Sequence, residues 1–357
     1  MEDNIRNNYP EPSEETIEID VPKGQTAIRL DQFLTKEIKG ATRTKIQNAI
    51  DAGKVFVNNK PAKASKKVQP FDVIKCGLLR YPPLELVPED IPLEIEFEDE
   101  ELMVVNKEPG MCSHPGVGNR YGTLINAVLW HLGVREAQKI EIDDDEKEEM
   151  KFLSEGVRPG LAHRLDKDTS GLLIISKNPE NMPFLQSQFS TRSISREYHT
   201  LVWGKLKETS GTIEGNIGRS PRDRKKFVVL RNGGKVAITD YEVIEEFPIA
   251  SYVKVKLRTG RTHQIRVHFG SIGHLVIGDH FYNGDKSPKT TSKFKRDLSN
   301  RVAAMANRQM LHAKKLELIH PLGQRSLEVD STLPKDFQDI LEVLRHYTKI
   351  FNQNLLS

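Results

Sequence analysis

The sequence predicts an α+β protein, in which a domain with a mostly antiparallel β-sheet follows a small α/β domain. Alternating apolar and polar residues, which are typical of half-buried strands, recur at 198–202, 241–243 and 252–257. Helical spacing is less frequent, and it lies near residues 183–189, 263–272 and 337–344. Strands in meander order with few intervening helices favour antiparallel pairing.

The composition is that of a soluble globular protein with room for two or three domains. The 357 residues are 37% hydrophobic and 29% charged, and no apolar run approaches the roughly 18 residues of a membrane span. The acidic, polar N-terminus does not resemble a secretory signal peptide. Cys76 and Cys112 lack CxxC spacing, which argues against a disulfide framework or a cysteine zinc site. We therefore expect a cytoplasmic protein with no membrane partner.

Charge is segregated along the chain, although the formal net charge is only +3. Residues 29–80 contain twelve basic and four acidic residues, and residues 286–315 contain nine and one, so each segment carries +8. Residues 1–20 contain seven acidic residues and one basic residue, a balance of −6. This segregation is typical of a protein that binds a polyanion, although ordinary solvated faces explain either basic segment alone equally well.

The first 80 residues predict an acidic flexible tail, residues 1–20, followed by a small domain, residues 21–80. Apolar residues at helical spacing begin at Leu30, and Thr42 or Thr44 is a suitable N-cap for a second helix. The other expected elements are a C-cap glycine at Gly53, strands at 54–57 and 73–74, and a turn at 58–59. The domain would therefore contain two short helices and a small sheet with many lysines.

A proline-rich segment, residues 81–92, predicts an extended linker to a larger domain, residues 93–345. The first strands of that domain are expected at 93–97 and 102–105. The acidic insertion at 136–155 predicts an exposed loop or a frayed helix. Residues 346–357 are expected to be a C-terminal tail.

The run HRLDKDTSG, residues 163–171, places a carboxylate between cations and turn-forming residues. It leads into the short apolar segment 172–175, which predicts a buried strand that would hold the loop rigidly. Loops held in this way often carry catalytic groups. Taken alone, however, the run is better interpreted as a solvated turn with an Asp–Arg pair.

A second polar run, GRTHQIRVH at residues 260–268, predicts a helix that Thr262 caps. The buried stripe of this helix would consist of Ile265, Phe269 and Ile272. His263 and Arg266 would then lie one turn apart on a neighbouring face. Without other context, this pattern is a capped helix with a basic solvent face.

Two other chemistries find little support in the sequence. The histidines show neither HExxH nor HxH spacing, so metal ligation is a minor alternative to structural or RNA-facing roles. Ser170 lacks the GxSxG context of an activated serine nucleophile and has no neighbouring base.

Several motifs occur in one order along the chain. They are the 163–171 run, Tyr198 in its Arg-Glu-Tyr context and the 260–266 run, with support from NKEPG at 106–110, HPG at 114–116, Gly278-Asp279 and LHA at 311–313. The ordered set resembles the RluA/RluD-type pseudouridine synthase family, and it covers about residues 21–345 together with the N-terminal domain. The acidic insertion and a basic insertion at 286–301 depart from the usual pattern, which leaves the substrate open.

The resemblance implies that the protein isomerises a uridine within an RNA chain. Asp166 would be the essential carboxylate, and it would either attack the ribose carbon or remove the neighbouring ribose proton. Both routes need an ionised carboxylate, for which Arg266 is the expected bidentate partner. Arg164 would fill the space of the flipped base and pair with phosphate, and Tyr198 would stack on the base.

The same resemblance implies further contacts to substrate and RNA. Within the larger domain, these are His163, Thr169, Arg261 and His263. The N-terminal domain resembles an S4-like (alpha-L) RNA-binding domain in its 29–34, 43–50 and 53–58 segments. Arg43 and Lys45 on its second helix would face phosphates. No cofactor and no metal are expected, and the protein is expected to be a monomer.

Two other functional classes remain as alternatives. A non-catalytic RNA-binding or ribosome-assembly protein would not need the combination of Asp166, Arg266 and Tyr198. A metal-dependent nuclease would need paired carboxylates or closely spaced histidines, which the sequence lacks. We therefore expect an RNA pseudouridine synthase that acts on large-subunit ribosomal RNA, with transfer RNA as an open alternative.

Overall fold

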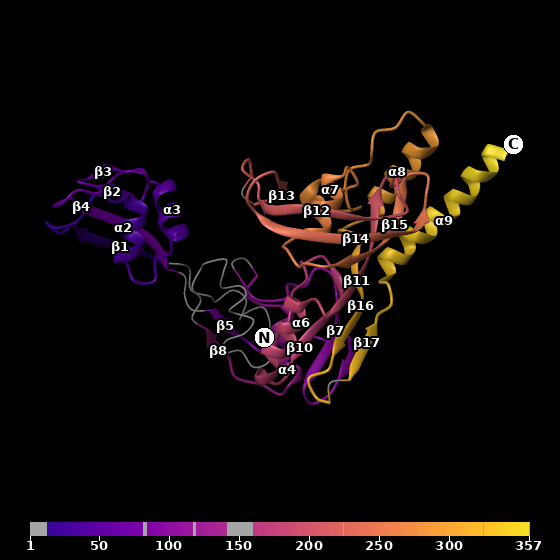
Figure 1. Ribbon diagram of the computed structural model, residues 1–357, viewed down its shortest axis with the longest axis horizontal. Coiled ribbons are helices and arrows are strands. Elements are labelled where there is room, and N and C mark those ends of the chain that lie inside the picture. The colour runs from indigo at the N-terminus through magenta and orange to yellow at the C-terminus, as the bar shows by residue number, and fades with distance from the viewer. Residues whose placement is uncertain are drawn as a thin grey trace. The chain divides into compact units, whose positions relative to one another are not determined.

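The computed structural model describes residues 13–80, 84–116, 119–140, 160–223, 225–323 and 325–356. The chain divides into two compact units, which are described separately (Figure 1). The N-terminal unit comprises residues 1–87, 115–121 and 135–156. The large unit comprises residues 88–114, 122–134 and 157–357. Its mixed α and β content, with mostly antiparallel strands, confirms the predicted fold class.

The N-terminal unit contains a four-stranded sheet with two helices packed against it. Its strands, in the order β1-β4-β2-β3, are β1 (Ser13–Asp20), β4 (Val73–Arg80), β2 (Val55–Val57) and β3 (Lys60–Pro61). Its helices are α2 (Leu30–Glu37) and α3 (Arg43–Asp51). Thr42 caps α3 by accepting the backbone N–H of Lys45 at 3.2 Å, and Gly53 beyond its C-terminus has φ +71°. Both predicted helices and the predicted cap are therefore confirmed.

The prediction of a flexible acidic tail is wrong for residues 13–20. These residues form β1, whose eight positions pair antiparallel with β4 from Ser13↔Arg80 to Asp20↔Val73. Ile17 and Ile19 pack against the core of the unit, because alternation places both on one face of the strand. The high density of acidic residues concealed this two-residue period. Residues 1–12 lie outside the described part of the chain.

The predicted linker and the predicted acidic insertion each contribute a strand. Strand β5 (Leu84–Leu86) pairs antiparallel with β8 (Gln138–Ile140). Residues 84–86 are therefore not simply an extended connection, and residues 138–140 are neither a loop nor a helix. The rest of the insertion, residues 141–155, lies outside the described part of the chain.

The large unit is built on an eleven-stranded sheet. Nine of its strands follow the order β13-β12-β14-β15-β11-β16-β10-β7-β6, while β17 pairs with β16 and β9 with β10. The bounds are β6 Ile95–Glu98, β7 Leu102–Lys107, β9 Gly160–Leu161, β10 Ser170–Ser176, β11 Ser195–Trp203, β12 Ser210–Arg219, β13 Phe227–Leu230, β14 Lys235–Glu246, β15 Ala250–Leu257, β16 Leu311–Ile319 and β17 Ser326–Asp330. Only the β10–β16 pair is parallel among these ladders of the described residues.

Helices cover this sheet at several places along its length (Figure 1). They are α4 (Leu124–His131), α6 (Met182–Thr191), α7 (Gln264–Ser271), α8 (Lys293–Met305) and α9 (Lys335–Leu356), with 3₁₀ turns η1 (Pro179–Asn181) and η2 (His280–Tyr282). Residues 346–356 continue α9, so the predicted C-terminal tail is wrong for them. The buried residues Phe337, Ile340 and Leu344 of α9 join a core that includes Leu298 and Val302 of α8.

Strand β10 places the end of the 163–171 run in the middle of this sheet. All seven of its residues are buried, as the sequence predicts. Its backbone pairs with β7 and β16, and Leu172 and Ile174 pack in one core with Met182 and Leu185 of α6. Gly171 has φ +110°, and a Cβ there would lie 2.3 Å from the carbonyl oxygen of Ala313. Only glycine allows this close approach of the two strands, which sets the point at which the polar loop begins.

Candidate active site

The loop before β10 is held at nearly every carbonyl, which gives the Asp166 side chain a fixed base. Ser113 Oγ donates to the carbonyl of Leu165 at 3.1 Å, and the Thr169 N–H donates to that of Asp166 at 3.0 Å. Arg308 Nη1 donates to the carbonyl of Asp168 at 3.1 Å. The contacts from Ser113 and Arg308 come from distant parts of the chain, so they hold the loop only within the folded unit.

The Lys107 side chain ties the other side of the loop. Its Nζ donates to the carbonyls of Glu108, Met111 and Lys167 at 2.8, 2.9 and 3.0 Å. Burial lowers the pKa of Lys107 to about 7, against the pull of Asp168 and other nearby negative charges. The Gly110 N–H also donates to the Lys167 carbonyl, at 2.9 Å. The NKEPG motif therefore supports the loop that carries Asp166.

Helix α7 begins in a different way from the prediction. Its N-cap is His263, in the left-handed region at φ 56°, and not Thr262. The Gln264 side chain supports this start: its Oε1 accepts from Thr259 Oγ1 and the Arg261 N–H, and its Nε2 donates to the carbonyl of Ile238 and to Thr239 Oγ1. Ile265 and Phe269 are buried as predicted, but Ile272 is 42% exposed. The helix is thus fixed by polar contacts to β14 and the preceding turn.

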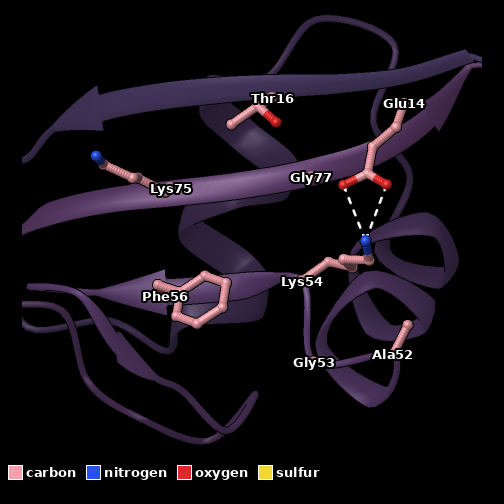
Figure 2. A pocket seen from close by; sticks show the side chains of 8 residues that line it. All are labelled: Glu14, Thr16, Ala52, Gly53, Lys54, Phe56, Lys75 and Gly77. Atoms are coloured by element: carbon pink, nitrogen blue, oxygen red, sulfur yellow. Dashed lines mark hydrogen bonds and ion pairs between the residues drawn. The ribbon is translucent and has the colours of Figure 1, made fainter.

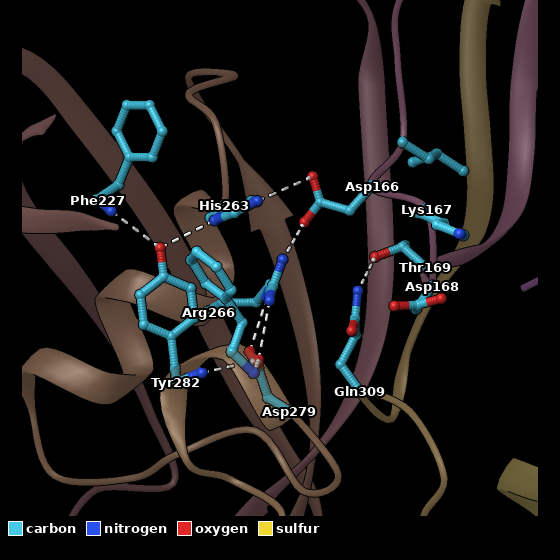
Figure 3. Close-up of polar contacts among 12 residues, drawn as sticks. Asp166, Lys167, Asp168, Thr169, Phe227, His263, Arg266, Asp279, Tyr282 and Gln309 are labelled. Carbon is cyan, nitrogen blue, oxygen red and sulfur yellow. Dashed lines mark hydrogen bonds and ion pairs between the residues drawn. The ribbon is translucent and has the colours of Figure 1, made fainter. Parts of the chain in front are cut away.

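An Asp166–Arg266–Asp279 cluster lies where the loop meets α7 (Figure 3). Arg266 Nη1 donates to Asp166 Oδ2 at 2.8 Å. Its Nε and Nη2 donate to the two oxygens of Asp279 at 2.7 and 2.8 Å. The bidentate partner of Arg266 is therefore Asp279, and the prediction that Asp166 holds this role is wrong. The reason is that α7 and the turn after it present Asp279 edge-on to the guanidinium.

The charges in this cluster keep Asp166 ionised. Burial acts to raise the pKa of Asp166, but the positive charges of His263 and Arg266 and the Arg266 hydrogen bond outweigh it, so the pKa lies below its ordinary 3.8. Burial also opposes the charge on Arg266, yet its bonds to Asp279 and the charge of Asp166 raise its pKa. Asp279 is 1% exposed, so the pair is enclosed in the protein.

His263 faces the second carboxylate oxygen of Asp166. Its Nε2 is 3.9 Å from Asp166 Oδ1, and its Nδ1 is 2.9 Å from the hydroxyl of Tyr282. Burial lowers the pKa of His263 from its ordinary 6.5, so the ring is neutral at pH 7, and its charge acts on Asp166 only in acid. Asp166 Oδ1 accepts no hydrogen bond from any described residue, which leaves it as the open oxygen of the carboxylate.

Tyr198 lies on β11, between Val255 of β15 and Ala313 of β16. Its side chain is buried, with 6% of the residue exposed. Burial raises the pKa of Tyr198, and the charge of Asp166 adds to that effect, which places the two side chains within electrostatic reach of each other. The three residues predicted as catalytic, Asp166, Arg266 and Tyr198, therefore lie on a loop, a helix and a strand of the large unit.

Comparisons with known proteins agree with this arrangement. Residues 101–271 match the family model described as RNA pseudouridylate synthase, and residues 28–74 match the S4 domain. A Chlorobaculum parvum protein named "Uncharacterized RNA pseudouridine synthase" is 44% identical over 331 residues, which cover 92% of this chain and 97% of that protein. The chain belongs to the RNA pseudouridine synthase family. It is accordingly an isomerase.

Two further comparisons support the same family. A Nitrosomonas europaea protein named "Ribosomal large subunit pseudouridine synthase D" is 38% identical over 336 residues, which cover 94% of this chain and 89% of that protein. The solved structure of human RNA Pseudouridylate Synthase Domain Containing 4 matches with a TM-score of 0.53 at 25% identity, and it covers 71% of this chain and 93% of that one. These findings confirm the predicted fold and the predicted family.

Three of the residues predicted to contact substrate or RNA have other contacts in this synthase. His163 is buried, and its Nε2 accepts the N–H of Ile174 at 3.1 Å. Thr169 is also buried and accepts from Gln309 Nε2 at 3.2 Å. Arg261 is exposed, but its Nε donates to the carbonyl of Val236 at 3.1 Å. We therefore reassign His163 and Thr169 to support of the loop, because their polar atoms face the interior. Arg164 is exposed beside the site.

The predicted RNA contacts of the S4 domain lie on α3. Arg43 is 62% exposed at its side chain and shares the buried Asp31 with Arg29, so this cluster keeps a net charge of +1. Lys45 is half-buried, and its Nζ is 3.4 Å from the carbonyl of Gly40. The same unit has a hollow of about 400 Å³ along its sheet. Figure 2 shows the side chains that line it, among which Lys54 binds Glu14 of β1.

Two residues near the site, Asp279 and Gln309, were not predicted as site residues from the sequence. Asp279 clamps Arg266, and its Oδ1 also accepts the N–H groups of Phe281 and Tyr282 at 3.1 Å each. Gln309 contacts the loop directly. The sequence signal for Asp279 was the Gly278-Asp279 motif. The structure explains the glycine, since a Cβ on residue 278 would lie 1.9 Å from the Arg308 carbonyl oxygen. Close backbone approach next to an acidic residue points to a fixed polar site.

The described residues contain no cluster of three or more His, Cys, Asp or Glu side chains that could hold a metal ion. In the same part of the chain, no helix is both long and apolar enough to cross a bilayer.

Proposed function

We propose that this synthase converts specific uridines to pseudouridine in large-subunit ribosomal RNA and that Asp166 is its essential carboxylate. One observation carries the assignment of Asp166: it is ionised, and Arg266 binds one oxygen while the other stays open. A permanently charged partner fixes both the charge and the direction of the carboxylate before the substrate arrives. This preorganisation suits attack on the ribose carbon as well as removal of the neighbouring proton.

The target base must leave the RNA stack to reach Asp166. In our proposal, the exposed Arg164 side chain occupies the vacated space and pairs with phosphate. Tyr198 would stack on the flipped base and help to remove its final ring proton, while His263 and Arg261 would bind substrate or RNA. The enzyme supplies geometry and charge, and the reaction needs no redox step.

The choice of ribosomal RNA rests on two supports. Relatives with 34–38% identity carry the name "Ribosomal large subunit pseudouridine synthase D". The S4 domain also lies in a segment with a charge balance of +8, as expected for a protein that follows a phosphate backbone. We further propose that the enzyme works in the cytoplasm as a monomer.

The direct test is a map of pseudouridines in RNA from cells with and without this gene. We expect one or more positions of large-subunit ribosomal RNA to lose pseudouridine on deletion and to regain it when the gene is restored. Loss confined to transfer RNA would refute the proposed substrate while leaving the reaction intact. An unchanged map in both RNA classes would refute the whole proposal.

Charge removal at two places on the S4 domain should have unequal effects on RNA affinity. Arg43→Ala/Lys45→Ala removes two positive charges from α3, and it should reduce the slope of log K against log salt by roughly 1.5 units. The matched control, Lys54→Ala/Lys75→Ala, also removes two charges. It should change the slope less, because Lys54 and Lys75 each have an acidic partner of their own on β1, Glu14 at 2.9 Å and Glu18 at 3.4 Å. On the other side of the comparison, Arg43 and Arg29 share the single Asp31.

Filter binding of a ribosomal RNA fragment over a range of salt concentrations measures both slopes. Equal slopes for the two double variants would show that α3 is not the phosphate-contacting face.

A further inference from the structure

Two hydrogen bonds link the backbone of β13 to the ring of His263, and that ring faces the open oxygen of Asp166. The N–H of Phe227 donates to the hydroxyl oxygen of Tyr282 at 3.1 Å. The same hydroxyl lies 2.9 Å from Nδ1 of His263, and Nε2 of that ring faces Asp166 Oδ1 at 3.9 Å. Figure 3 shows this series of groups leading to Asp166 Oδ1, while Arg266 binds the other oxygen, Oδ2.

The direction of the hydrogen bonds follows from the donors available. The Phe227 N–H can only donate, so the Tyr282 oxygen accepts there. Within the described residues, Nδ1 of His263 is the other polar partner of this hydroxyl, so the O–H proton is directed to Nδ1. A neutral imidazole that accepts at Nδ1 carries its proton on Nε2. The opposite tautomer would leave the Tyr282 proton without an acceptor and turn a lone pair toward the carboxylate.

The surroundings of His263 hold the ring in one place. Phe227, Phe281 and Tyr282 meet it edge-on, with ring centroids 5.9, 5.5 and 5.6 Å away. The backbone of His263 is in the left-handed region at φ 56°, which costs energy for a residue other than glycine. His263 is the N-cap residue of α7, but its side chain caps no helix N–H. Its strained backbone therefore positions the ring and does not serve the helix end.

Charged groups face the ring from each element around it. Asp166 and Arg164 lie on the loop before β10, Arg266 on α7 and Asp279 before η2, and all four act on the His263 charge. Two are negative and two are positive, so their charges oppose one another and burial decides that the ring is neutral at pH 7. A neutral donor is what the tautomer argument requires.

We propose that Tyr282 fixes His263 as the Nε2–H tautomer and that this N–H donates a hydrogen bond to a carbonyl oxygen of the departing uracil ring. The inference rests on the proposed function and assigns one further catalytic residue, His263, and one positioning residue, Tyr282. The separation of 3.9 Å between Nε2 and Oδ1 is too long for a hydrogen bond. It leaves a place beside both atoms where substrate atoms can lie about 3 Å from each.

The chemistry of the isomerisation creates the charge that such a donor would stabilise. When the bond between the ring nitrogen and the ribose carbon breaks, its electron pair leaves with the uracil, and negative charge spreads to the ring carbonyl oxygens. The later bond from the ring carbon to ribose uses an electron pair of the anion. The ring carbon then gives its proton to Tyr198 or to water, and the freed ring nitrogen takes up one proton, so the product is an isomer of the substrate. His263 transfers no proton in this scheme. It binds the anion more strongly than the uncharged ring, which lowers the barrier.

Two substitutions separate this role from a purely structural one. His263→Gln places an amide N–H near the position of Nε2, whereas His263→Asn reaches only the position of Nδ1. Asparagine tolerates the left-handed backbone better than glutamine does. A structural role therefore predicts that Asn is the better replacement, and a donor role predicts that Gln is.

We expect the single-turnover rate at saturating RNA to fall roughly 100-fold in His263→Asn and about 10-fold in His263→Gln, since one lost donor costs about 10²–10³ in rate. The Km for RNA should change little in either variant. A rate for His263→Asn equal to or above that of His263→Gln would overturn the proposal. Thermal melting of both variants checks that the protein is folded.

Tyr282→Phe tests the other half of the proposal. It should lower the rate about 10-fold and let ¹⁵N NMR of the histidine ring detect protonated Nδ1 at position 263. The matched control is Tyr252→Phe, which also removes a tyrosine hydroxyl bonded to a histidine Nδ1, that of His199. The control should keep its rate within about twofold. A Tyr282→Phe enzyme with the wild-type rate and an unchanged tautomer would refute the positioning role.

These outcomes are distinguishable from failure of the proposed function. If Asp166→Asn stays active, the assignment of Asp166 is wrong whatever His263 does. If Asp166→Asn is inactive while both His263 variants keep the wild-type rate, only the inference about His263 and Tyr282 fails.

Discussion

Asp166→Asn is expected to lower the rate of pseudouridine formation by roughly 10⁴-fold or more, as removal of a central catalytic group does in other enzymes. The amide can neither attack the ribose carbon nor accept its neighbouring proton. It keeps an oxygen that can accept from Arg266, so folding and RNA binding should remain nearly intact. Release of tritium from the ring carbon of labelled uridine measures the rate, because that carbon loses its hydrogen during isomerisation.

The control for this experiment lies two residues away. Asp168→Asn makes the same chemical change in the same loop, but Arg308 contacts residue 168 at its backbone carbonyl, which the substitution leaves in place. Its rate should stay within about tenfold of wild type. Activity of Asp166→Asn comparable with that of Asp168→Asn would show that another group performs the chemistry.

Removal of Arg266 is expected to have the second largest effect, and its structural and catalytic parts can be separated. Arg266→Gln leaves Asp279, which is 1% exposed, without its cation, and breaking a buried pair in this way costs about 3–5 kcal/mol of stability. The rate should fall about 100-fold or more, because Asp166 loses the charge and the bond that direct it.

The double variant Arg266→Gln/Asp279→Asn tells the two parts apart. The amide of residue 279 can still accept the N–H groups of Phe281 and Tyr282, so denaturant unfolding should show most of the stability restored. The rate should remain low. If the double variant regains activity together with stability, then Arg266 acts only by holding the fold.

The pH dependence of Arg266→Gln follows from the pKa of Asp166. The ionised form is the reactive one, so activity falls as pH drops through that pKa. In the wild type the pKa is below 3.8, and loss of activity through Asp166 should begin only in strong acid. Without the guanidinium, burial raises the pKa, and the acid limb of log kcat against pH should move to higher pH. An unmoved limb would show that Arg266 does not set the charge of Asp166.

Local patterns predicted much of the fold correctly. The helices at Leu30, Arg43 and Gln264 and the buried strand β10 follow from spacing and apolar content, which act over a few residues. The prediction failed where the content of acidic residues was given more weight than the two-residue alternation of apolar side chains. In residues 13–20, the acidic side chains suggested a tail, yet Ile17 and Ile19 alternate and face a core. The prediction of a C-terminal tail was also wrong for residues 346–356, because α9 continues through them.

By itself, the sequence determined the family. The resemblance of its motifs to that family names Asp166, Tyr198 and Arg266 as candidate catalytic residues. It could not determine what each side chain touches. His163 and Thr169 lie in the same motif as Asp166, yet they face inward, since the turn into β10 directs successive side chains to different sides.

Only the tertiary structure decided how the site is assembled. It places Asp166 against an arginine one hundred positions later and pairs that arginine bidentately with Asp279. It also places His263, which Tyr282 contacts, near the second oxygen of Asp166. These contacts depend on strand register, on the close approach of Gly171 to Ala313 and on the strained turn at His263. Such features arise from packing between distant segments, and a short stretch of sequence carries no record of their distances or angles.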